Sequence, residues 1–350
     1  MDQERLDAFI GTAVTDLAAA ESAAVAYVGD VLGLYRTMAG AGAMSSAELA
    51  NRTGTQERLV REWLHNQVAG GYVDYHADEG TFELPDEHAA VLADEDSPVF
   101  AGGILEVIAA MWADTDRVIG AFRADGALGW HQHDARLYRG VERVFRPIYR
   151  AQLVNEWIPA LEGAEARLQS GATVADVGCG HGASTIVMAT AYPNSRFVGF
   201  DYHQDSIAAA RRAAEEADVG DRVRFEVASA DSFPGSSYDL VCYFDCLHDM
   251  GDPIGAAAHA REVLVDDGWV MAVEPAAGDD LRENVNPVSR LFYAGSVFLC
   301  TPSSLAQDGR LGLGAQAGEK RLGAVFEKAG FRRFRRATET PFNLVLEARP

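Results

Sequence analysis

Positive charge is scarce in this chain of 350 residues. It has 30 Lys or Arg against 52 Asp or Glu, which gives a formal net charge of −22. A protein that binds nucleic acid neutralises phosphates with clustered Lys and Arg. We therefore expect no nucleic acid among its partners.

Cysteines and long apolar runs are also few. Cys179, Cys242, Cys246 and Cys300 form no CxxC pair and are too sparse for a disulfide framework, so we expect reduced thiols. No stretch approaches the roughly 18 uninterrupted apolar residues of a membrane span, and the acidic start Met1–Glu4 lacks the basic region of a signal peptide. These absences predict a cytoplasmic protein with no membrane partner.

The first hundred residues carry the pattern of a small helical domain. Ser45 and Glu48 have the spacing of a capping box, and Thr55 can cap the helix that follows. Gly70–Gly71 ends that second helix, which has an apolar face at helical spacing. The face consists of Leu59, Val60, Trp63, Leu64 and Val68.

A β-hairpin is predicted next, because Tyr72–Tyr75 and Thr81–Leu84 flank a turn. Helix, turn, helix and hairpin together predict a winged-helix-like domain over residues 1–97. Residues 1–100 contain 18 Asp or Glu against 5 Arg and no Lys, so a phosphate backbone would be repelled. We expect this domain to pack a dimer or to act as a lid, and not to bind DNA.

Residues 98–170 are predicted to be a helical connector with two apolar helix faces. These faces consist of Val107, Ile108, Met111 and Trp112, and of Val141, Val144, Phe145, Ile148 and Tyr149. His131 and His133 have a spacing that metal ligands use, but one such pair is weak evidence. We expect no metal here.

From residue 171 to residue 350, strand and helix patterns alternate. Strands are predicted at Val174–Val177, Phe197–Asp201, Val223–Ala228, Leu240–Phe244 and Trp269–Glu274, with helices such as Ser206–Ala217 and Ile254–Val265 between them. This alternation predicts an α/β domain with a parallel, doubly wound sheet. A helical insert over Val288–Leu299, a helix over Glu319–Ala329 capped by Gly330, and two strands should follow.

The first of these strands ends in Asp176 and a turn with Gly178, Gly180 and Gly182. Such a turn lets a ligand approach the backbone at a helix N-terminus. It also fits the dinucleotide fingerprint, so a nicotinamide-dependent oxidoreductase is one interpretation. Asp176 instead suits a ligand with a cationic amino group, and the carboxylate of Asp231 can accept from an adenine amino group.

These motifs, in this order, resemble those of the class I S-adenosylmethionine-dependent methyltransferases over residues 171–350. The resemblance implies a Rossmann-like sheet of seven strands whose last hairpin, Phe331–Arg336 and Phe342–Glu347, is antiparallel. It also implies that Asp201 binds the cofactor's ribose and that Asp231 lies at its adenine. The full set of cofactor-binding residues is expected to be Asp176, Gly178, Gly180, Gly182, Asp201, Tyr202, Ala230, Asp231, Ser232, Phe244 and Asp245.

The segment Phe244–Pro253 looks like the His-Asp-Trp segment of the plant-type small-molecule O-methyltransferases, with Met250 in place of the tryptophan. The resemblance implies that His248 is a general base and that Glu274 orients it. Histidine suits this work because its unperturbed pKa is about 6.5. A second family acid is missing: Gln316 stands at its position and Glu319 one turn later.

We therefore predict an S-adenosylmethionine-dependent methyltransferase of a small, apolar or aromatic acceptor, with O-methylation favoured. The N-terminal resemblance implies a homodimer. The acceptor pocket is expected to draw on the insert and on the connector, from Leu291, Phe292, Tyr293, Val297, Phe298, Trp112, Phe145 and Tyr149. A regulatory protein that binds the cofactor without turnover remains an alternative, and metal binding around Asp245, Cys246, His248 and Asp249 a weaker one.

Overall fold

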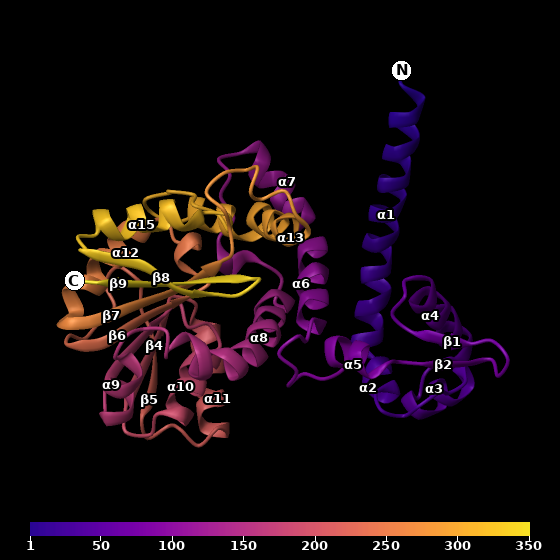
Figure 1. Ribbon diagram of the computed structural model, residues 1–350, viewed down its shortest axis with the longest axis horizontal. Coiled ribbons are helices and arrows are strands. Elements are labelled where there is room, and N and C mark those ends of the chain that lie inside the picture. Colours follow the sequence, from indigo (N-terminus) through magenta and orange to yellow (C-terminus); the bar gives the residue numbers. More distant parts are fainter. The chain divides into compact units, whose positions relative to one another are not determined.

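The computed structural model describes residues 1–350, and contacts divide the chain into two compact units. Unit 1 comprises Met1–Trp112 and Ala135–Pro147; unit 2 comprises Ala113–Asp134 and Ile148–Pro350. Residues of the stretch 98–170 therefore contribute to both units. Figure 1 labels the elements of each.

Unit 1 is helical apart from one short hairpin. Its elements are α1 Gln3–Val31, α2 Leu34–Met38, α3 Ser46–Thr53, α4 Glu57–Ala69, β1 Asp74–His76, β2 Thr81–Glu83, α5 Asp86–Leu92, α6 Gly102–Ala113 and α8 Arg136–Ile148. Trp63 of α4 packs edge-on against Tyr35 and donates its indole N–H to the carbonyl of Val25 at 3.0 Å. Ser45 caps α3 by accepting from the N–H of Glu48 at 3.2 Å, which confirms the serine half of the predicted capping box; the Glu48 carboxylate pairs with Arg52 instead.

Two details of this unit differ from the sequence-based prediction. Thr55 does not cap α4: the N-cap is Gln56, and the Thr55 hydroxyl lies 2.8 Å from that of Thr53. A hydroxyl that forms a hydrogen bond with a neighbouring side chain is not available to cap the helix. Leu59 is 70% exposed and does not belong to the buried face of α4. The face of α4 that packs against the rest of the unit is narrower than the apolar face predicted from the sequence.

α1 meets the length and composition of a membrane-crossing helix, a test that signal sequences and the core helices of soluble proteins also pass. Its most apolar 18-residue window is not buried within the unit. Exposed apolar side chains line this window, among them Phe9, Ile10, Val14 and Leu17.

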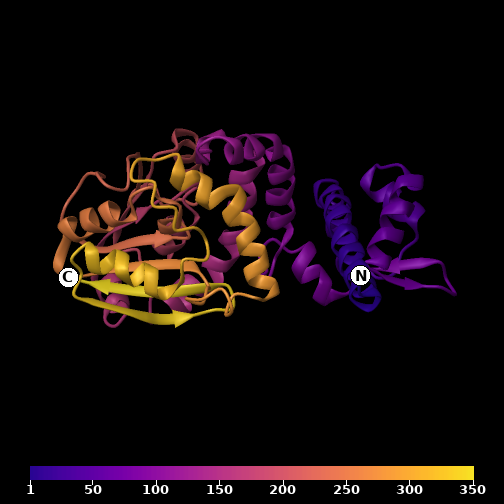
Figure 2. The same cartoon turned by 90° about the horizontal axis from the view of Figure 1, so that it is seen from above.

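Unit 2 is built on a seven-stranded sheet with the order β5-β4-β3-β6-β7-β9-β8. Its strands are β3 Thr173–Val177, β4 Arg196–Asp201, β5 Val223–Val227, β6 Tyr238–Phe244, β7 Leu264–Pro275, β8 Arg333–Glu339 and β9 Asn343–Arg349. The first five are parallel, whereas β9 is antiparallel to β7 and β8 to β9. Figure 2 shows the hairpin of β8 and β9 along one edge. The predicted sheet is confirmed.

Helices cover both faces of this sheet, with α12 and α15 on one side and α9, α10 and α11 on the other (Figure 1). The helical elements are α7 Thr115–Arg123, η1 Trp130–Gln132, η2 Tyr149–Trp157, α9 Ala164–Ser170, α10 Ala183–Ala191, α11 Gln204–Glu216, η3 Leu247–Asp249, α12 Pro253–Val263, α13 Pro287–Gly295, η4 Ser296–Cys300, α14 Thr301–Leu305 and α15 Gly318–Lys328. Every residue of β6 is buried, as expected of a central parallel strand. All five parallel strands end at one edge, where ligands bind in this architecture.

Candidate functional site

The glycine turn lies at the carboxyl end of β3. Gly178, Gly180 and Gly182 have φ angles of 76°, 52° and 79°, a region that side chains disfavour. A Cβ at Gly182 would lie 2.5 Å from Cζ of Phe225, so this glycine is needed for close packing of α10. Nothing lies within 4 Å of a Cβ at Gly180. The backbone there is open to a ligand.

Asp176, in β3 directly before the turn, is 1% exposed. Its Oδ2 accepts from the hydroxyls of Ser184 and Thr185, each at 2.6 Å, whereas its Oδ1 has no partner. Burial raises the pKa of Asp176 to about 6, against the lowering effect of the two hydroxyls. A buried carboxylate oxygen without a donor is costly, and a cationic ligand group would satisfy it.

Asp201 ends β4 beside this turn and links the two segments. Its two oxygens accept from the N–H of Gly180 at 2.9 Å and from the N–H of His203 at 2.8 Å. Burial raises the pKa of Asp201, while the two N–H donors partly oppose the rise. Each carboxylate oxygen keeps a lone pair for a further donor, such as a hydroxyl. Tyr202, the next residue, is 44% exposed.

The residues after β5 are more open. Ala230 is half-buried, whereas Asp231 and Ser232 are exposed and joined by a hydrogen bond from the serine hydroxyl at 3.0 Å. Hydrogen bonds from Ser229 and Ser232 lower the pKa of Asp231. Asp231 makes its hydrogen bonds with Ser229 and Ser232 and none with the glycine turn, although β5, β4 and β3 are neighbours in the sheet.

At the end of β6, Phe244 is buried, and its ring lies 5.3 Å from that of Tyr149. Asp245 has a φ of 49° and accepts from the Asn343 amide at 3.0 and 3.2 Å. Burial raises the pKa of Tyr149 well above 10.0, and the carboxylates of Asp245 and Asp176 raise it further. Tyr149 therefore lies near the carboxyl ends of β6 and β3.

His248 lies in η3, directly beyond β6, and is 3% exposed. Its Nδ1 lies 2.5 Å from Oε2 of Glu274, which is fully buried near the end of β7. The other oxygen of Glu274 accepts from the N–H of Leu247 at 2.9 Å. The carboxylate thus holds both the backbone and the ring, and the tautomer with Nδ1 protonated is favoured.

The other ring nitrogen of His248, Nε2, lies 3.0 Å from Oδ1 of Asp249. Burial alone would lower the pKa of His248, but the carboxylates of Asp249 and Glu274 outweigh it and raise the pKa well above 6.5. The two carboxylates therefore favour the protonated form of the ring when no substrate is bound. A molecule that displaces Asp249 from Nε2 removes part of this stabilisation and favours release of the proton.

Gln316 and Glu319, the residues at and near the position of the missing family acid, contact neither His248 nor Glu274. Glu319 forms an ion pair with Arg336 of β8, and the side-chain amide of Gln316 donates to the carbonyl of Ala315 at 3.4 Å. Cys300, the last residue of η4, is instead brought close to His248 and Asp249. Nothing in the sequence around Cys300 indicated this position.

The proposed acceptor-pocket residues divide between the two units. Trp112 and Phe145 belong to unit 1, whereas the insert residues and Tyr149 belong to unit 2. Phe298 packs against Val118, Ala121 and Leu128. Leu291 and Val297 are 42% and 43% exposed and are available to a ligand.

The pair His131 and His133 does not form a joint site. His131 is exposed, whereas His133 is buried with its Nδ1 2.9 Å from Oδ2 of Asp114. Burial lowers the pKa of His133, and Asp114 partly opposes this.

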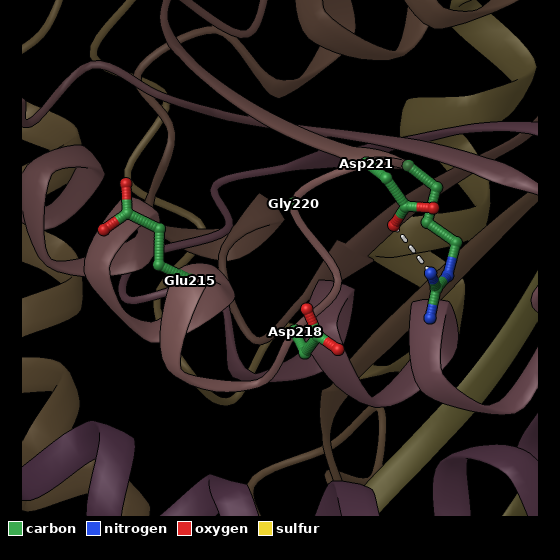
Figure 3. A pocket seen from close by; sticks show the side chains of 5 residues that line it. Glu215, Asp218, Gly220 and Asp221 are labelled. Atoms are coloured by element: carbon green, nitrogen blue, oxygen red, sulfur yellow. Dashed lines mark hydrogen bonds and ion pairs between the residues drawn. The ribbon is translucent and has the colours of Figure 1, made fainter.

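A recess of about 450 Å³ lies at the opposite edge of the sheet, before β5 (Figure 3). Glu215, Asp218, Gly220, Asp221 and Arg222 line it, and the guanidinium of Arg222 donates to Asp221 at 2.7 Å. Three carboxylates and a paired arginine offer little to an apolar ligand. This recess is separate from the residues described above.

Two family models match the chain. Residues 168–330 match one described as "Methyltransferase domain", and residues 20–94 match one described as "Rv2258c-like winged HTH domain". The prediction of a methyltransferase domain behind a winged-helix-like domain is confirmed.

A curated relative, the 27-O-demethylrifamycin SV methyltransferase of Amycolatopsis mediterranei (strain S699), is 32% identical over 131 residues. The match covers 35% of this chain and 48% of that relative, so the chain spans about half the length of the curated relative.

Solved structures share the fold over almost the whole chain. The structure of the mitomycin 7-O-methyltransferase has a TM-score of 0.73 and 18% identity, with 100% of both chains covered. Human N-acetylserotonin methyltransferase in complex with SAM has a TM-score of 0.72 and 16% identity, with 97% of each covered. A methyltransferase of calicheamicin biosynthesis in its SAH-bound form has a TM-score of 0.67 and 21% identity, with 100% of each covered. At these identities the likeness shows the fold.

Proposed function

We propose that this chain, a methyltransferase domain behind a winged HTH domain, transfers a methyl group from S-adenosylmethionine to a hydroxyl of a small, apolar or aromatic acceptor. The observation that carries this proposal is the buried pair of His248 and Glu274, 2.5 Å apart, at the same edge of the sheet as the glycine turn. The residues at the glycine turn suit the cofactor, and the pair of His248 and Glu274 suits proton removal.

The residues at the glycine turn fit S-adenosylmethionine. The unpartnered Oδ1 of Asp176 suits the ammonium group of the methionine part, and the open backbone at Gly180 allows close approach. Asp201 has lone pairs for two ribose hydroxyls, and Asp231 lies in the loop expected at the adenine. Tyr202, Ala230, Ser232, Phe244 and Asp245 complete the proposed cofactor site.

S-adenosylmethionine supplies a methyl group on a cationic sulfur, which becomes a neutral thioether when an acceptor oxygen takes the methyl group. His248 then needs to remove the proton of that oxygen. In this scheme the acceptor hydroxyl replaces Asp249 at Nε2 and donates its hydrogen bond there. Glu274 keeps Nδ1 protonated and stabilises the imidazolium ion that forms. Positioning of the two reactants supplies the rest of the acceleration.

The acceptor is proposed to be apolar or aromatic because the insert offers apolar side chains near His248. η3 packs against η4 and α14, so the insert and the base are neighbours. Leu291 and Val297 of the insert are partly exposed. Pockets of this kind bind ligands through apolar contacts and a few placed polar groups.

Unit 1 is proposed to join two copies of the chain. The exposed side chains of Phe9, Val14 and Leu17 form an apolar stripe on α1 that a second copy can cover. Nucleic acid is not expected at α4, because Arg58 pairs with Glu62 and Arg61 with Glu57, each at 2.6 Å. The proposal therefore includes a cytoplasmic homodimer that acts on a small molecule.

The test is a screen of hydroxylated apolar compounds with S-adenosylmethionine, in which S-adenosylhomocysteine formation is measured. We expect acceptor-dependent turnover by the wild type and strongly reduced turnover by His248→Ala. Unchanged turnover in the variant would exclude His248 as the base. Absence of cofactor binding would overturn the proposed function as a whole.

A further inference from the structure

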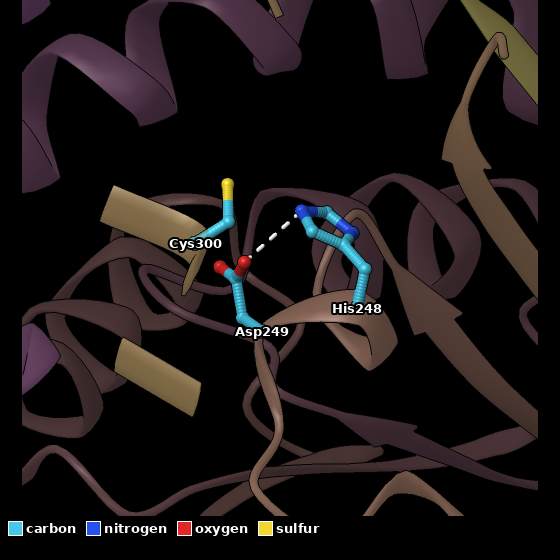
Figure 4. A group of neighbouring side chains, drawn as sticks. All are labelled: His248, Asp249 and Cys300. Atoms are coloured by element: carbon cyan, nitrogen blue, oxygen red, sulfur yellow. Dashed lines mark ion pairs between the residues drawn. The ribbon is translucent and has the colours of Figure 1, made fainter. Parts of the chain in front are cut away.

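Three side chains that bind metals meet beside the proposed base. A ring nitrogen of His248, a carboxylate oxygen of Asp249 and the sulfur of Cys300 all lie within 4.8 Å of one another. The first two come from η3 and the third from η4, so the fold joins residues that are about fifty positions apart. Figure 4 shows the three side chains grouped together, with the Asp249 carboxylate paired with a ring nitrogen of His248.

Imidazole, carboxylate and thiolate are the usual protein ligands of Zn²⁺. Their bonds to zinc are about 2.0–2.3 Å long, so ligand atoms in a tetrahedral site lie about 3.5 Å apart. Nε2 of His248 and Oδ1 of Asp249 are 3.0 Å apart. The sulfur of Cys300 lies within 4.8 Å of both atoms, so a bound cation requires only that the three side chains draw together.

The surroundings of His248 also suit a metal ligand. Glu274 accepts from Nδ1, so Nε2 faces the cluster and can bind a metal once it has lost its proton, as in the carboxylate–histidine–zinc arrangement. Glu274 is itself held by the N–H of Leu247. His248 and Cys300 are 3% and 8% exposed, so both ligands are held in place by packing.

We propose that His248, Asp249 and Cys300 bind a divalent cation of the Zn²⁺ class and that the bound cation inhibits methyl transfer by occupying Nε2. On binding, Nε2 of His248 and the thiol of Cys300 each release a proton to solvent, and the freed electron pairs of the nitrogen and the sulfur form bonds to the metal. No oxidation or reduction takes place, and water fills the fourth position. The inhibitory part rests on the proposed function, whereas the binding part does not.

The binding part is tested by titrating the purified full chain with Co²⁺, which reports a thiolate ligand by its near-ultraviolet charge-transfer band. We expect this band and visible d–d bands to saturate at about one Co²⁺ per chain, and Zn²⁺ to abolish them. Cys300→Ser and Cys300→Ala should lose the charge-transfer band. The matched control Cys242→Ser, which removes another buried thiol, should keep it. Absence of the band in the wild type, or its persistence in both Cys300 variants, would overturn the proposal.

The inhibitory part is tested in the methyl-transfer assay with added Zn²⁺. We expect Zn²⁺ to abolish wild-type turnover and to act at least about tenfold more weakly on Cys300→Ser, because one ligand is lost. Equal inhibition of both proteins would overturn this part. A chain that shows the cobalt bands but no turnover with any acceptor would instead contradict the proposed function alone.

Discussion

Replacing Asp176 with asparagine removes a buried charge but keeps the shape of the side chain. A pKa of about 6 instead of 3.8 means that the folded chain loses about 3 kcal/mol by keeping this carboxylate ionised at neutral pH. In the variant, the amide nitrogen takes the place of the unpartnered Oδ1, which costs about 1–3 kcal/mol. The two effects offset each other. The unliganded variant should unfold at the wild-type temperature or up to a few degrees higher.

Binding of S-adenosylmethionine should respond in the opposite direction. A hydrogen bond between charged groups contributes about 1.5–3 kcal/mol, so its loss in Asp176→Asn weakens binding by about 10- to 150-fold. Isothermal titration calorimetry at neutral pH measures this, with Asp266→Asn as a control that removes an exposed carboxylate instead. Wild-type affinity in the Asp176 variant would refute the contact.

The pH dependence provides a second check on Asp176. Its carboxylate is ionised above about pH 6, and the amino group of the ligand is a cation below about pH 8, so affinity should be greatest between these values. The folded-state pKa lies above the unfolded one. The folded chain therefore takes up the proton first, and wild-type stability relative to Asp176→Asn should rise as the pH falls from about 6 to about 4. A flat difference across this range would contradict the raised pKa.

Four further outcomes are expected. His248→Ala should lower kcat by about 10²- to 10⁴-fold, and Glu274→Gln by about 10- to 100-fold, with cofactor affinity unchanged in both. If calorimetry shows that a variant has lost cofactor binding as well as turnover, the variant has misfolded and the base is not tested by it. In the wild type, kcat/KM should rise with pH through an apparent pKa above 6.5. Asp249→Asn should lower this apparent pKa, because a carboxylate that raises the pKa of His248 is lost. An unchanged apparent pKa would contradict the proposed effect of Asp249 on His248. Gly182→Ala should lower the free energy of unfolding by at least about 1–2 kcal/mol, since its φ is 79°, and chemical denaturation measures this. Leu17→Asp should shift the chain from dimer to monomer in sedimentation velocity, and a wild-type profile would exclude α1 from the interface.

Local patterns were sufficient to predict the five parallel strands, whereas the antiparallel hairpin at the edge of the sheet was implied by the family resemblance. Most of the parallel strands are short, largely apolar runs, and β5 alternates apolar and charged residues; these signals depend only on neighbours in the chain. The predicted run Val174–Val177 corresponds to β3, and Leu240–Phe244 lies within β6. The Ser45 cap and Gly330, with a φ of 90° after α15, are local for the same reason.

Predictions that required knowledge of the partner were less accurate. The apolar pattern included Leu59 in a buried face, because periodicity does not show how wide the opposing surface is. Glu319, one turn beyond the missing family acid, pairs with Arg336, a residue of a strand that follows it. The meeting of Cys300 with His248 depends on how the insert folds back over η3. No spacing in the sequence encodes such a contact.

The resemblance to known methyltransferases indicated one contact between distant residues that local patterns could not predict. It indicated Glu274 as the partner of His248, and the two side chains lie 2.5 Å apart. It did not indicate Asp249 at Nε2, because the family's mechanism concerns the ring with a substrate bound. Tyr149 was predicted to line the acceptor pocket, but its contact with the ring of Phe244 was not predicted, because helical periodicity does not show which residue of another element a side chain meets.

Calorimetric titration of the purified chain with S-adenosylmethionine, and in parallel with NAD, tests the cofactor assignment most directly. We expect a saturable binding heat for S-adenosylmethionine with about one site per chain, and no saturable heat for NAD. Absence of binding to S-adenosylmethionine, or saturable binding of NAD alone, would contradict the proposal that the glycine turn and Asp176 hold a methyl donor.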